Sequence, residues 1–431
     1  MEQTINIGLM GLGTVGTGVV RLIEGHQEDL MHQTGMRIRI ARILVRDPEK
    51  PRAVRVRREL LTTDPRDILE DPSIDVVVEV MGHVEPTRQY LLEALRRGKH
   101  VVTANKDLMA LHGGEILALA AERGCDVFYE ASVAGGIPIL RALVEGFSSD
   151  RITKLMGIVN GTTNYILTKM SREGADYAQA LREAQELGYA EADPTSDVEG
   201  LDAARKMAIL ATLGFRTEVQ LDEVDVTGIS KVTAEDIVYA KQLGYEIKLL
   251  GIAAQEDGLI EVSVEPTLVP QRHPLASVDG VMNAVYVYGE AVGETMFYGP
   301  GAGELPTATA VVSDLVTVVK NMKLGVNGRG MVAPYRPKAL KTPEQMVAQY
   351  FLRLVVDDRT GVLAKITQLF ADCDISLSQV LQEPFKGAGQ AEIILVTHHA
   401  TKKSKDEALA RLAALDVVRE IKSCYRVEGE D

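Results

Sequence analysis

The sequence has no tryptophan, few cysteines and no long apolar run. Its three cysteines, Cys125, Cys373 and Cys424, are far apart and form no Cys-x-x-Cys pair. No uninterrupted apolar stretch reaches the roughly 18–20 residues that a membrane-spanning helix needs. A strand-like segment begins at Thr4, with no secretory leader before it. We therefore expect a protein of the reducing cytoplasm, with no membrane partner.

Charge and length restrict the partners and the architecture. The 47 Lys and Arg residues against 61 Asp and Glu residues give a formal charge of -14, which disfavours nucleic acid and anionic membrane surfaces as partners. A chain of 431 residues exceeds the roughly 250–300 residues at which single cores stop growing. We expect two or three domains.

A glycine-rich motif follows the first predicted strand. Residues 4–10 read as a buried strand, Gly11-Leu-Gly-Thr-Val-Gly16 follows, and residues 17–24 are helix-like. In this order the motif is typical of dinucleotide binding. Gly11 makes the turn, Gly13 lets the backbone approach the pyrophosphate, and Gly16 lets helix and strand pack closely. The alternative is a tight strand-to-helix turn without a ligand.

The residue after the second predicted strand bears on cofactor choice. That strand covers residues 37–45 and ends at Arg46, where the dinucleotide pattern expects an acidic residue for the adenosine ribose. An arginine suits a ribose 2′-phosphate, so NADP is favoured over NAD. Asp47 keeps NAD open, and Arg46 could instead be a solvated loop charge.

Strands and helices then alternate, which predicts a parallel sheet with helices on both faces. Ligands of such sheets sit beyond the carboxyl ends of the strands. Two loops stand there: Ala104-Asn-Lys106, and the glycine-rich segment Glu130–Pro138. Lys106 could equally be a surface charge, and the glycines simple turn chemistry. The expected strands are 75–80, 100–103 and 127–130, and the expected helices are 85–97 and 107–123.

The stretch Gly188–Lys206 contains five carboxylate side chains and ends in a lysine. Ser196 and Glu199 have the spacing of a capping box, which predicts one helix from about position 197 past Lys206. Asp202 and Lys206 are four apart and would share a face of that helix. Together they could bind an amino acid and move its proton. The alternative is a solvated face with an ordinary ion pair, worth about 0.3–0.5 kcal/mol.

The last part of the chain reads as a separate unit. A glycine-rich turn, Tyr298–Gly303, precedes a helix at about 304–325 that we expect to return to the nucleotide domain. Residues 328–348 read as a linker. Residues 349–431 give the order β-α-β-β-α-β, a ferredoxin-like unit. The expected fold is α/β: an N-terminal Rossmann-type doubly wound sheet at 1–135, an α+β substrate and dimerisation domain at 136–303, and the ferredoxin-like unit.

With these motifs assembled, the chain resembles the homoserine dehydrogenase family over nearly its whole length. The resemblance rests on the motifs that begin at Gly11, Thr103, Tyr129, Asn160 and Gly188. The C-terminal unit, with Asp-Arg-Thr-Gly-Val-Leu from Asp358, resembles an ACT domain. The resemblance implies reversible hydride transfer between a nicotinamide cofactor and C4 of the L-homoserine/L-aspartate 4-semialdehyde pair, in threonine, methionine and isoleucine biosynthesis.

The resemblance also implies roles for residues at matching positions. Lys206 would be the acid/base for the substrate oxygen, with Asp202 acting beside it and Asp202 and Glu191 binding substrate. A monovalent cation, usually sodium, would be held by Glu130 with the backbone carbonyls of Val133, Gly135 and Ile137. The implied cofactor contacts are Gly11, Gly13, Thr14, Val15, Gly16, Arg46, Gly82, Lys106, Gly188 and Gly303.

Regulation and assembly are implied in the same way. The ACT domain would sense threonine, the end product, or would help to form a homodimer or homotetramer. Two alternatives remain at this point. An aspartate-semialdehyde dehydrogenase needs a nucleophilic cysteine, but Cys125 lies before a strand and reads as core. A catalytically inert amino-acid sensor would have no use for Lys206 with Asp202.

Overall fold

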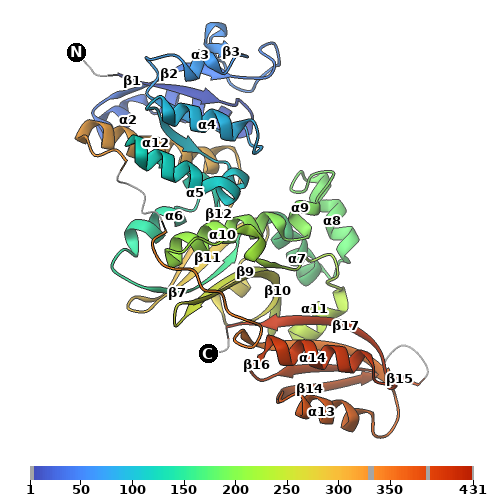
Figure 1. Ribbon diagram of the computed structural model, residues 1–431. Helices are drawn as coiled ribbons and strands as arrows, with labels where there is room; N and C mark the ends of the chain where they lie inside the picture. Colours follow the sequence, from blue (N-terminus) through green and yellow to red (C-terminus); the bar gives the residue numbers. More distant parts are fainter. Residues whose placement is uncertain (1–3, 329–333, 385–388, 430–431) are drawn as a thin grey trace. The chain divides into compact units, whose positions relative to one another are not determined.

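The computed structural model describes residues 4–328, 334–384 and 389–429 (Figure 1). The chain forms two compact units. The first contains residues 1–155, 205–223 and 283–337, and the second contains 156–204, 224–282 and 338–431. Three elements, β7 (Ile152–Ile158), α10 (Leu201–Phe215) and β11 (Met282–Gly289), contribute residues to both.

The first unit is built on a six-stranded parallel sheet with the order β3-β2-β1-β4-β5-β6. This is the Rossmann order, in which β1 lies centrally and the strand order reverses beside it. The predicted doubly wound sheet is therefore confirmed. Its strands are β1 (Thr4–Met10), β2 (Arg37–Leu44), β3 (Leu61–Thr62), β4 (Val76–Glu79), β5 (His100–Thr103) and β6 (Val127–Phe128).

Helices cover both faces of this sheet because its strands carry apolar side chains on both faces, and these side chains are buried under the helices. Ile7 and Leu9 of β1 share one core cluster with α1 (Thr14–Gly25) and α12 (Glu304–Leu324). A Cβ on Gly8, which points the other way, would lie 2.4 Å from Ile68 of α3 (Arg66–Leu69). On that side α3 contacts α4 (Thr87–Arg96), and α4 contacts α5 (Lys106–Arg123).

The other elements of the first unit are short. They are α2 (Gln27–Thr34), η1 (Arg58–Leu60), η2 (Glu130–Ser132), α6 (Ile139–Arg141), the π-helical turn η3 (Ala142–Gly146), η4 (Leu221–Glu223) and β12 (Gly293–Pro300). Several predicted bounds differ from the structure by one to three residues, and two of these differences lie beside the predicted ligand loops. Helix α1 begins at Thr14, three residues before the expected start, and the chain after Phe128 enters the 3-10 turn η2 instead of extending as strand to Glu130.

The second unit contains a sheet with the strand order β9-β10-β17-β13-β15-β14. Strand β17 pairs in parallel with β10 and antiparallel with β13, so the C-terminal unit continues the sheet of the preceding domain. Short strands β8 and β16 pair with β10 and β13. The strands are β8 (Asp225–Val226), β9 (Tyr245–Glu256), β10 (Leu259–Pro270), β13 (Val347–Asp357), β14 (Leu377–Pro384), β15 (Gln390–Thr397), β16 (Ala400–Thr401) and β17 (Val418–Val427).

The C-terminal part has the predicted β-α-β-β-α-β order. Alternate residues of β13, such as Leu352 and Leu354, pack in one core with α13 (Val362–Asp372) and α14 (Lys402–Ala413). Arg353, between them, points to the opposite face and pairs with Asp236 of α11 (Ala234–Gln242) at 3.1 Å. The remaining elements are α7 (Gly161–Glu173), α8 (Tyr177–Glu186), α9 (Thr195–Val198) and η5 (Pro274–Ser277).

The predicted helix from position 197 past Lys206 is wrong, because two helices stand there. Helix α9 ends before Gly200, whose φ of 80° interrupts the helical path, and α10 begins at Leu201. Ser196 is the second residue of α9 and does not occupy its N-cap position. Part of the expected linker, residues 329–333, lies outside the described residues.

Candidate active site

The glycine-rich loop after β1 has the geometry of a dinucleotide loop. Gly11 has a φ of 106°, and a Cβ on it would lie 2.9 Å from the Val80 carbonyl oxygen. A Cβ on Gly16 would lie 2.3 Å from the Gly11 oxygen, so only glycine permits this close packing. A Cβ on Gly13 would meet no described atom within 4 Å. Gly13 is the N-cap of α1, where backbone N–H groups and the helix dipole favour phosphate.

The neighbouring predicted contacts lie around the same end of the sheet. Thr14 is exposed at the start of α1, whereas Val15 packs against the core. Arg46 and Asp47 are both exposed just beyond β2. Asp47 accepts a hydrogen bond from the Glu49 amide at 2.8 Å, so its carboxylate already orders its own loop.

A buried carboxylate that the sequence analysis missed organises the loops after β4 and β5. Glu79 is fully buried, and its Oε1 accepts hydrogen bonds from the amides of Met81 (2.7 Å) and Gly82 (3.1 Å). Its Oε2 accepts one from the Thr103 hydroxyl at 2.5 Å. Burial raises the pKa of Glu79. The predicted contact Gly82 is thus held by Glu79, and its φ of 73° requires the left-handed region.

Lys106 is the first residue of α5, and its position is set by Asn105. The Asn105 side chain accepts a hydrogen bond from Leu108 N at 3.0 Å, which caps the helix. Its Nδ2 donates to the His83 carbonyl at 2.7 Å, which ties the loop after β5 to the loop after β4. Lys106 is half-buried. Gly82 and Lys106 therefore follow two neighbouring strands, β4 and β5, and one hydrogen-bond network joins their loops. Both residues lie at the edge of the sheet where a ligand is expected.

In the second unit, Asn160 gathers two members of the carboxylate-rich stretch. Its Nδ2 lies 2.8 Å from Asp197 Oδ1 and 2.9 Å from Asp202 Oδ2. Its Oδ1 accepts from Thr163 N at 2.9 Å and so caps α7. Asn160 and Asp202 are both buried. The motif that begins at Asn160 therefore orients Asp202, a role that sequence reasoning did not assign.

The same motif also holds the loop that contains Gly188. The Thr162 hydroxyl donates to the Tyr189 carbonyl at 2.7 Å. Gly188 has a φ of 76° and follows α8.

Glu191, two residues beyond Tyr189, is exposed. Asp193 is occupied locally, because its Oδ1 accepts from the Thr195 amide and hydroxyl at 3.1 and 2.6 Å, and these bonds lower its pKa.

Asp202 and Lys206 both belong to α10. They stand four residues apart, so they project from the same side of the helix. Asp202 is 6% exposed, whereas Lys206 is half-buried. The predicted shared face is thus present, although the helix begins later than expected.

The segment from Glu130 to Ile137 forms a tight, buried loop in the first unit. Ala134 and Gly135 both have positive φ, 55° and 43°, which is uncommon for alanine. A Cβ on Gly135 would lie 2.4 Å from the Gly301 oxygen, and Gly136 N donates to the Pro300 oxygen at 3.0 Å. The loop therefore packs directly on the glycine-rich turn that ends at Gly303, the N-cap of α12.

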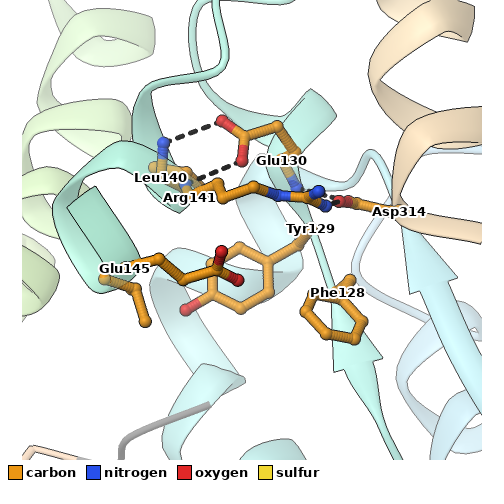
Figure 2. Close-up of a pocket in the computed structure, with 8 residues that line it drawn as sticks. Phe128, Tyr129, Glu130, Leu140, Arg141, Glu145 and Asp314 are labelled. Carbon is orange, nitrogen blue, oxygen red and sulfur yellow. Dashed lines mark hydrogen bonds and ion pairs between the residues drawn. The ribbon is translucent and has the colours of Figure 1, made fainter. Parts of the chain in front are cut away.

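A small cavity of about 20 Å³ lies beside Glu130 (Figure 2). The Glu130 carboxylate accepts hydrogen bonds from the amides of Leu140 (2.7 Å) and Arg141 (2.8 Å), one on each oxygen. Asp314 accepts from Glu130 N at 2.8 Å and pairs with Arg141 at 3.1 Å. Burial raises the pKa of Asp314 to about 7, with a further increase from the negative charge of Glu130. Burial also raises the pKa of Glu130.

Three family models match the chain. They are described as homoserine dehydrogenase, NAD binding domain (residues 11–130), homoserine dehydrogenase (138–316) and ACT domain (350–417). Homoserine dehydrogenase from Bacillus subtilis is 60% identical over 428 residues, which cover 99% of each chain. The chain belongs to the homoserine dehydrogenase family.

Solved structures of homoserine dehydrogenases agree with this fold. The enzyme from Thiobacillus denitrificans is 44% identical, has a TM-score of 0.92 and matches 99% of both chains. A hyperthermophilic archaeal homoserine dehydrogenase, solved in complex with NADPH, is 27% identical, with a TM-score of 0.62. It covers 73% of this chain and 98% of its own.

Family membership gives the coarse function. The chain is of an NAD(P)-type oxidoreductase family with a dinucleotide-binding domain and a C-terminal ACT domain. Membership of the homoserine dehydrogenase family accounts for the motifs without either alternative class, the semialdehyde dehydrogenase with a catalytic cysteine or the inert sensor. Cys125 is buried, and burial raises its thiol pKa, which is the opposite of what a nucleophile requires. No helix in the described part of the chain is long and apolar enough to cross a membrane.

Proposed function

We propose that this protein interconverts L-homoserine and L-aspartate 4-semialdehyde, with Lys206 and Asp202 in the central roles. The observation that carries the proposal is the buried group in which Asn160 orients Asp202 on the helix that also bears Lys206. Family membership supplies the reaction, and this geometry supplies a fixed carboxylate one helical turn from a lysine. When bound, the nicotinamide cofactor supplies or accepts the hydride.

The side chains have separate tasks in this proposal. Oxidation of the homoserine hydroxyl releases a proton, and reduction of the aldehyde needs one, so a group at the substrate oxygen must hold and return it. Lys206 does this and stabilises the negative charge that develops on the oxygen. Asp202 and Glu191 bind the substrate and balance its ammonium charge. Asp202 is fixed by Asn160, whereas exposed Glu191 depends on its loop.

We assign NADP as the favoured cofactor, with NAD as the second choice. Among the predicted contacts, Gly11 and Gly13 follow β1, Gly16 lies in the first turn of α1, and Gly82 follows β4. Arg46, exposed beyond β2, supports NADP because a guanidinium pairs well with a 2′-phosphate. The archaeal relative solved with NADPH also supports this choice. Lys106, Gly188 and Gly303 stay predictions as cofactor contacts.

A sodium ion at the Glu130 loop is part of the proposal. The donors would be Glu130 and the backbone carbonyls of Val133, Gly135 and Ile137, and oxygen-only ligands fit a hard cation. The successive positive φ values of Ala134 and Gly135 fit such a ligand loop, since strained backbone is kept where a function holds it. Among the described residues no group of three or more His, Cys, Asp or Glu side chains gathers for a metal. The cation would order the loop through its carbonyls.

We further propose that threonine regulates the enzyme through the ACT domain and that the chain acts as a cytoplasmic homodimer or homotetramer. Regulation is supported by the continuous sheet, because β17 of the ACT domain pairs with β10 of the catalytic part. Truncation is a poor test of this idea, since it would strip β10 of a neighbour and leave buried Asp236 without Arg353.

The decisive experiment is a steady-state assay of the full chain. Homoserine-dependent reduction of NADP and of NAD would be measured with and without threonine, and with sodium replaced by a larger organic cation. Turnover with NADP above NAD, inhibition by threonine and dependence on sodium are the expected results. A chain that binds NADP but shows no homoserine-dependent reduction would contradict the dehydrogenase assignment and favour the sensor.

A further inference from the structure

The buried carboxylate of Glu79 closes a ring of hydrogen bonds between the loops that follow β4 and β5. It accepts from backbone amides just after β4 and from the Thr103 hydroxyl at the end of β5. The hydroxyl oxygen of Thr103 accepts in turn from Asn105 N at 3.0 Å, and Asn105 Nδ2 donates back to the His83 carbonyl at 2.7 Å. The Glu79 ring, as we call it, consists of Glu79, Met81, Gly82, His83, Thr103 and Asn105.

The ring holds an uncommon backbone conformation after β4. Gly82 and His83 have φ values of 73° and 61°, in the left-handed region that residues other than glycine seldom adopt. Glu79 fixes the Gly82 amide, the Thr87 hydroxyl donates to the Gly82 carbonyl at 3.0 Å, and Asn105 fixes the His83 carbonyl. Such a conformation persists only where the surrounding contacts hold it. Loss of the ring should therefore let this loop relax.

The direction of the two amides decides what the loop can offer a ligand. The amide hydrogens of Met81 and Gly82 point at Glu79, so they do not form an anion-binding site, and the negative carboxylate behind them repels a phosphate. The α-carbon of Gly82 is open, because a Cβ there would meet no described atom within 4 Å. The loop thus presents a fixed surface that suits a part of the cofactor other than its phosphates.

The sheet topology shows which part of the cofactor that is. The strand order β3-β2-β1-β4-β5-β6 reverses between β1 and β4, and a dinucleotide crosses the sheet at such a point. Its pyrophosphate lies at the start of α1, and its adenosine ribose lies beyond β2, on the far side of β1 from β4. The nicotinamide half must then extend over the ends of β4 and β5, where the Glu79 ring lies.

We propose that Glu79 is a positioning residue for the nicotinamide half of the cofactor. It does not touch the cofactor but holds the loop after β4 in the shape over which that half lies. A loop that keeps this shape only part of the time lowers the apparent affinity by the fraction of time it is formed. The inference rests on the nicotinamide cofactor proposed above and adds the residue that shapes its site.

Three variants of the ring test the proposal in the full-length protein. Glu79→Gln keeps the size of the side chain but leaves one acceptor oxygen for the three donors Met81 N, Gly82 N and the Thr103 hydroxyl. Thr103→Val keeps the shape of a fully buried residue but removes the hydroxyl that joins Glu79 to Asn105. Thr103→Ser restores that hydroxyl and is the conservative rescue.

Calorimetry would measure the binding of NADP and of adenosine 2′,5′-bisphosphate, which lacks the nicotinamide half. Glu79→Gln and Thr103→Val should each weaken NADP about tenfold or more and leave the affinity for the bisphosphate unchanged. Thr103→Ser should bind NADP nearly as the unchanged protein does. NAD with adenosine diphosphate forms a second pair, so the comparison does not depend on which cofactor the chain favours.

The matched control is a buried carboxylate at the opposite edge of the same sheet. Asp126 precedes β6 and accepts from Asn321 Nδ2, Asn327 Nδ2 and Gly328 N at 2.9, 2.7 and 2.7 Å. Asp126→Asn should lower the free energy of unfolding, as the ring variants do, because it also leaves a buried donor without its acceptor. It should not change the affinity for either ligand.

The outcomes separate a positioning role from a purely structural one. Unchanged NADP affinity in both Glu79→Gln and Thr103→Val would overturn the proposal. Equal weakening of NADP and the bisphosphate in both variants would also overturn it, since the ring would then support the whole domain. A chain that shows this affinity pattern but no homoserine-dependent reduction of NADP would contradict the proposed function and still support the role of Glu79.

Discussion

The side-chain nitrogen of Asn160 lies 2.9 Å from an oxygen of Asp202. The same nitrogen lies 2.8 Å from Asp197, so one amide group serves two carboxylates. Asn160 is itself fixed, because its oxygen caps α7. The orientation of Asp202 therefore depends on a residue 42 positions earlier in the chain.

Replacing Asn160 with aspartate should lower kcat about tenfold to a hundredfold. The new side chain keeps the oxygen that caps α7 but loses the donor to Asp202, and small misplacements of reacting groups cost this much. The added negative charge should also raise the pKa of the neighbouring carboxylates, which moves the acidic limb of the pH–rate profile to higher pH. Kinetics between about pH 5 and pH 9 would measure both effects.

The matched control is Asn164→Asp on the same helix. Asn164 Nδ2 donates to backbone carbonyls, such as that of Gly280 at 2.9 Å, and to neither of the two carboxylates. This variant should be less stable but should keep kcat and the pH profile. Equal kinetic losses in both variants would show that Asn160 acts only through the fold.

Removing Lys206 should abolish nearly all turnover while NADP still binds. General acid–base groups contribute about 10²–10⁴-fold, so Lys206→Ala should lose activity in that range. Lys206→Arg keeps the positive charge but cannot release a proton, so it should not rescue turnover. Lys231→Ala, at an exposed position, is the control. Substantial activity in Lys206→Ala would mean that another group moves the proton.

Arg46→Ala should raise the KM for NADP about tenfold or more and leave the KM for NAD nearly unchanged. The reason is the loss of a charge-assisted contact with the 2′-phosphate, worth roughly 1.5–3 kcal/mol. Arg57→Ala removes the same charge from a side chain that is 70% exposed and should change neither KM. If both cofactors weaken equally in Arg46→Ala, the arginine does not select between them.

In sodium-free buffer, where the proposed cation is absent from Glu130, Asp314 should make the stability of the protein fall as the pH rises from about 4 to about 8. Its folded-state pKa is raised to about 7 from 3.8, so the folded protein holds a proton that the unfolded chain releases. That contribution is complete below pH 3.8 and is lost as the pH passes through about 7. As the pH rises across this range, the free energy of unfolding of Asp314→Asn should therefore increase relative to that of the unchanged protein by roughly 2–4 kcal/mol. Urea unfolding at several pH values would measure this difference.

A carboxylate with the opposite shift is the control for Asp314. The amides of Ala291 and Val292 donate to Asp150 and lower its pKa, so it stays ionised across that range. Asp150→Asn should change stability by the same amount at every pH above about 5. A pH-independent difference for Asp314→Asn as well would show that Asp314 does not titrate there.

Arg353→Leu should destabilise the second unit by about 3–5 kcal/mol. The side chain is 5% exposed and pairs with Asp236 and Glu392, which would stay buried without their cation. Arg419→Leu removes a pair with Asp357 whose arginine is 54% exposed, so it should cost at most about 1 kcal/mol. Denaturant midpoints would measure both, and equal effects would mean that burial does not set the strength of the Arg353 pairs.

The sequence predicted the parts of the fold that have local signals. The Gly11–Gly16 loop, the parallel sheet and the order of the C-terminal unit follow from glycine spacing and apolar periodicity, and all three are present. A local signal was also missed. Thr233 and Asp236 form a complete capping box at the start of α11, while the similar spacing at Ser196 and Glu199 does not cap a helix. Gly200, which separates the two helices there, was the stronger signal.

The site could be predicted only in part, because its side chains are fixed by distant partners. Glu79 ends a strand of valines and gives no sign of its hydrogen bond to Thr103, which lies 24 residues away. Asn160 and Asp202 are 42 residues apart. Such contacts have no periodicity to detect, so one sequence can suggest which residues react but not which residues hold them.

Strand β17 lies between β10 and β13, with a parallel neighbour on one side and an antiparallel neighbour on the other. During synthesis, β10 and β13 leave the ribosome long before residues 418–427. The sheet of the second unit therefore cannot close until this last strand is translated. Until then the facing edges of β10 and β13 are exposed, which makes the growing chain prone to strand-mediated aggregation.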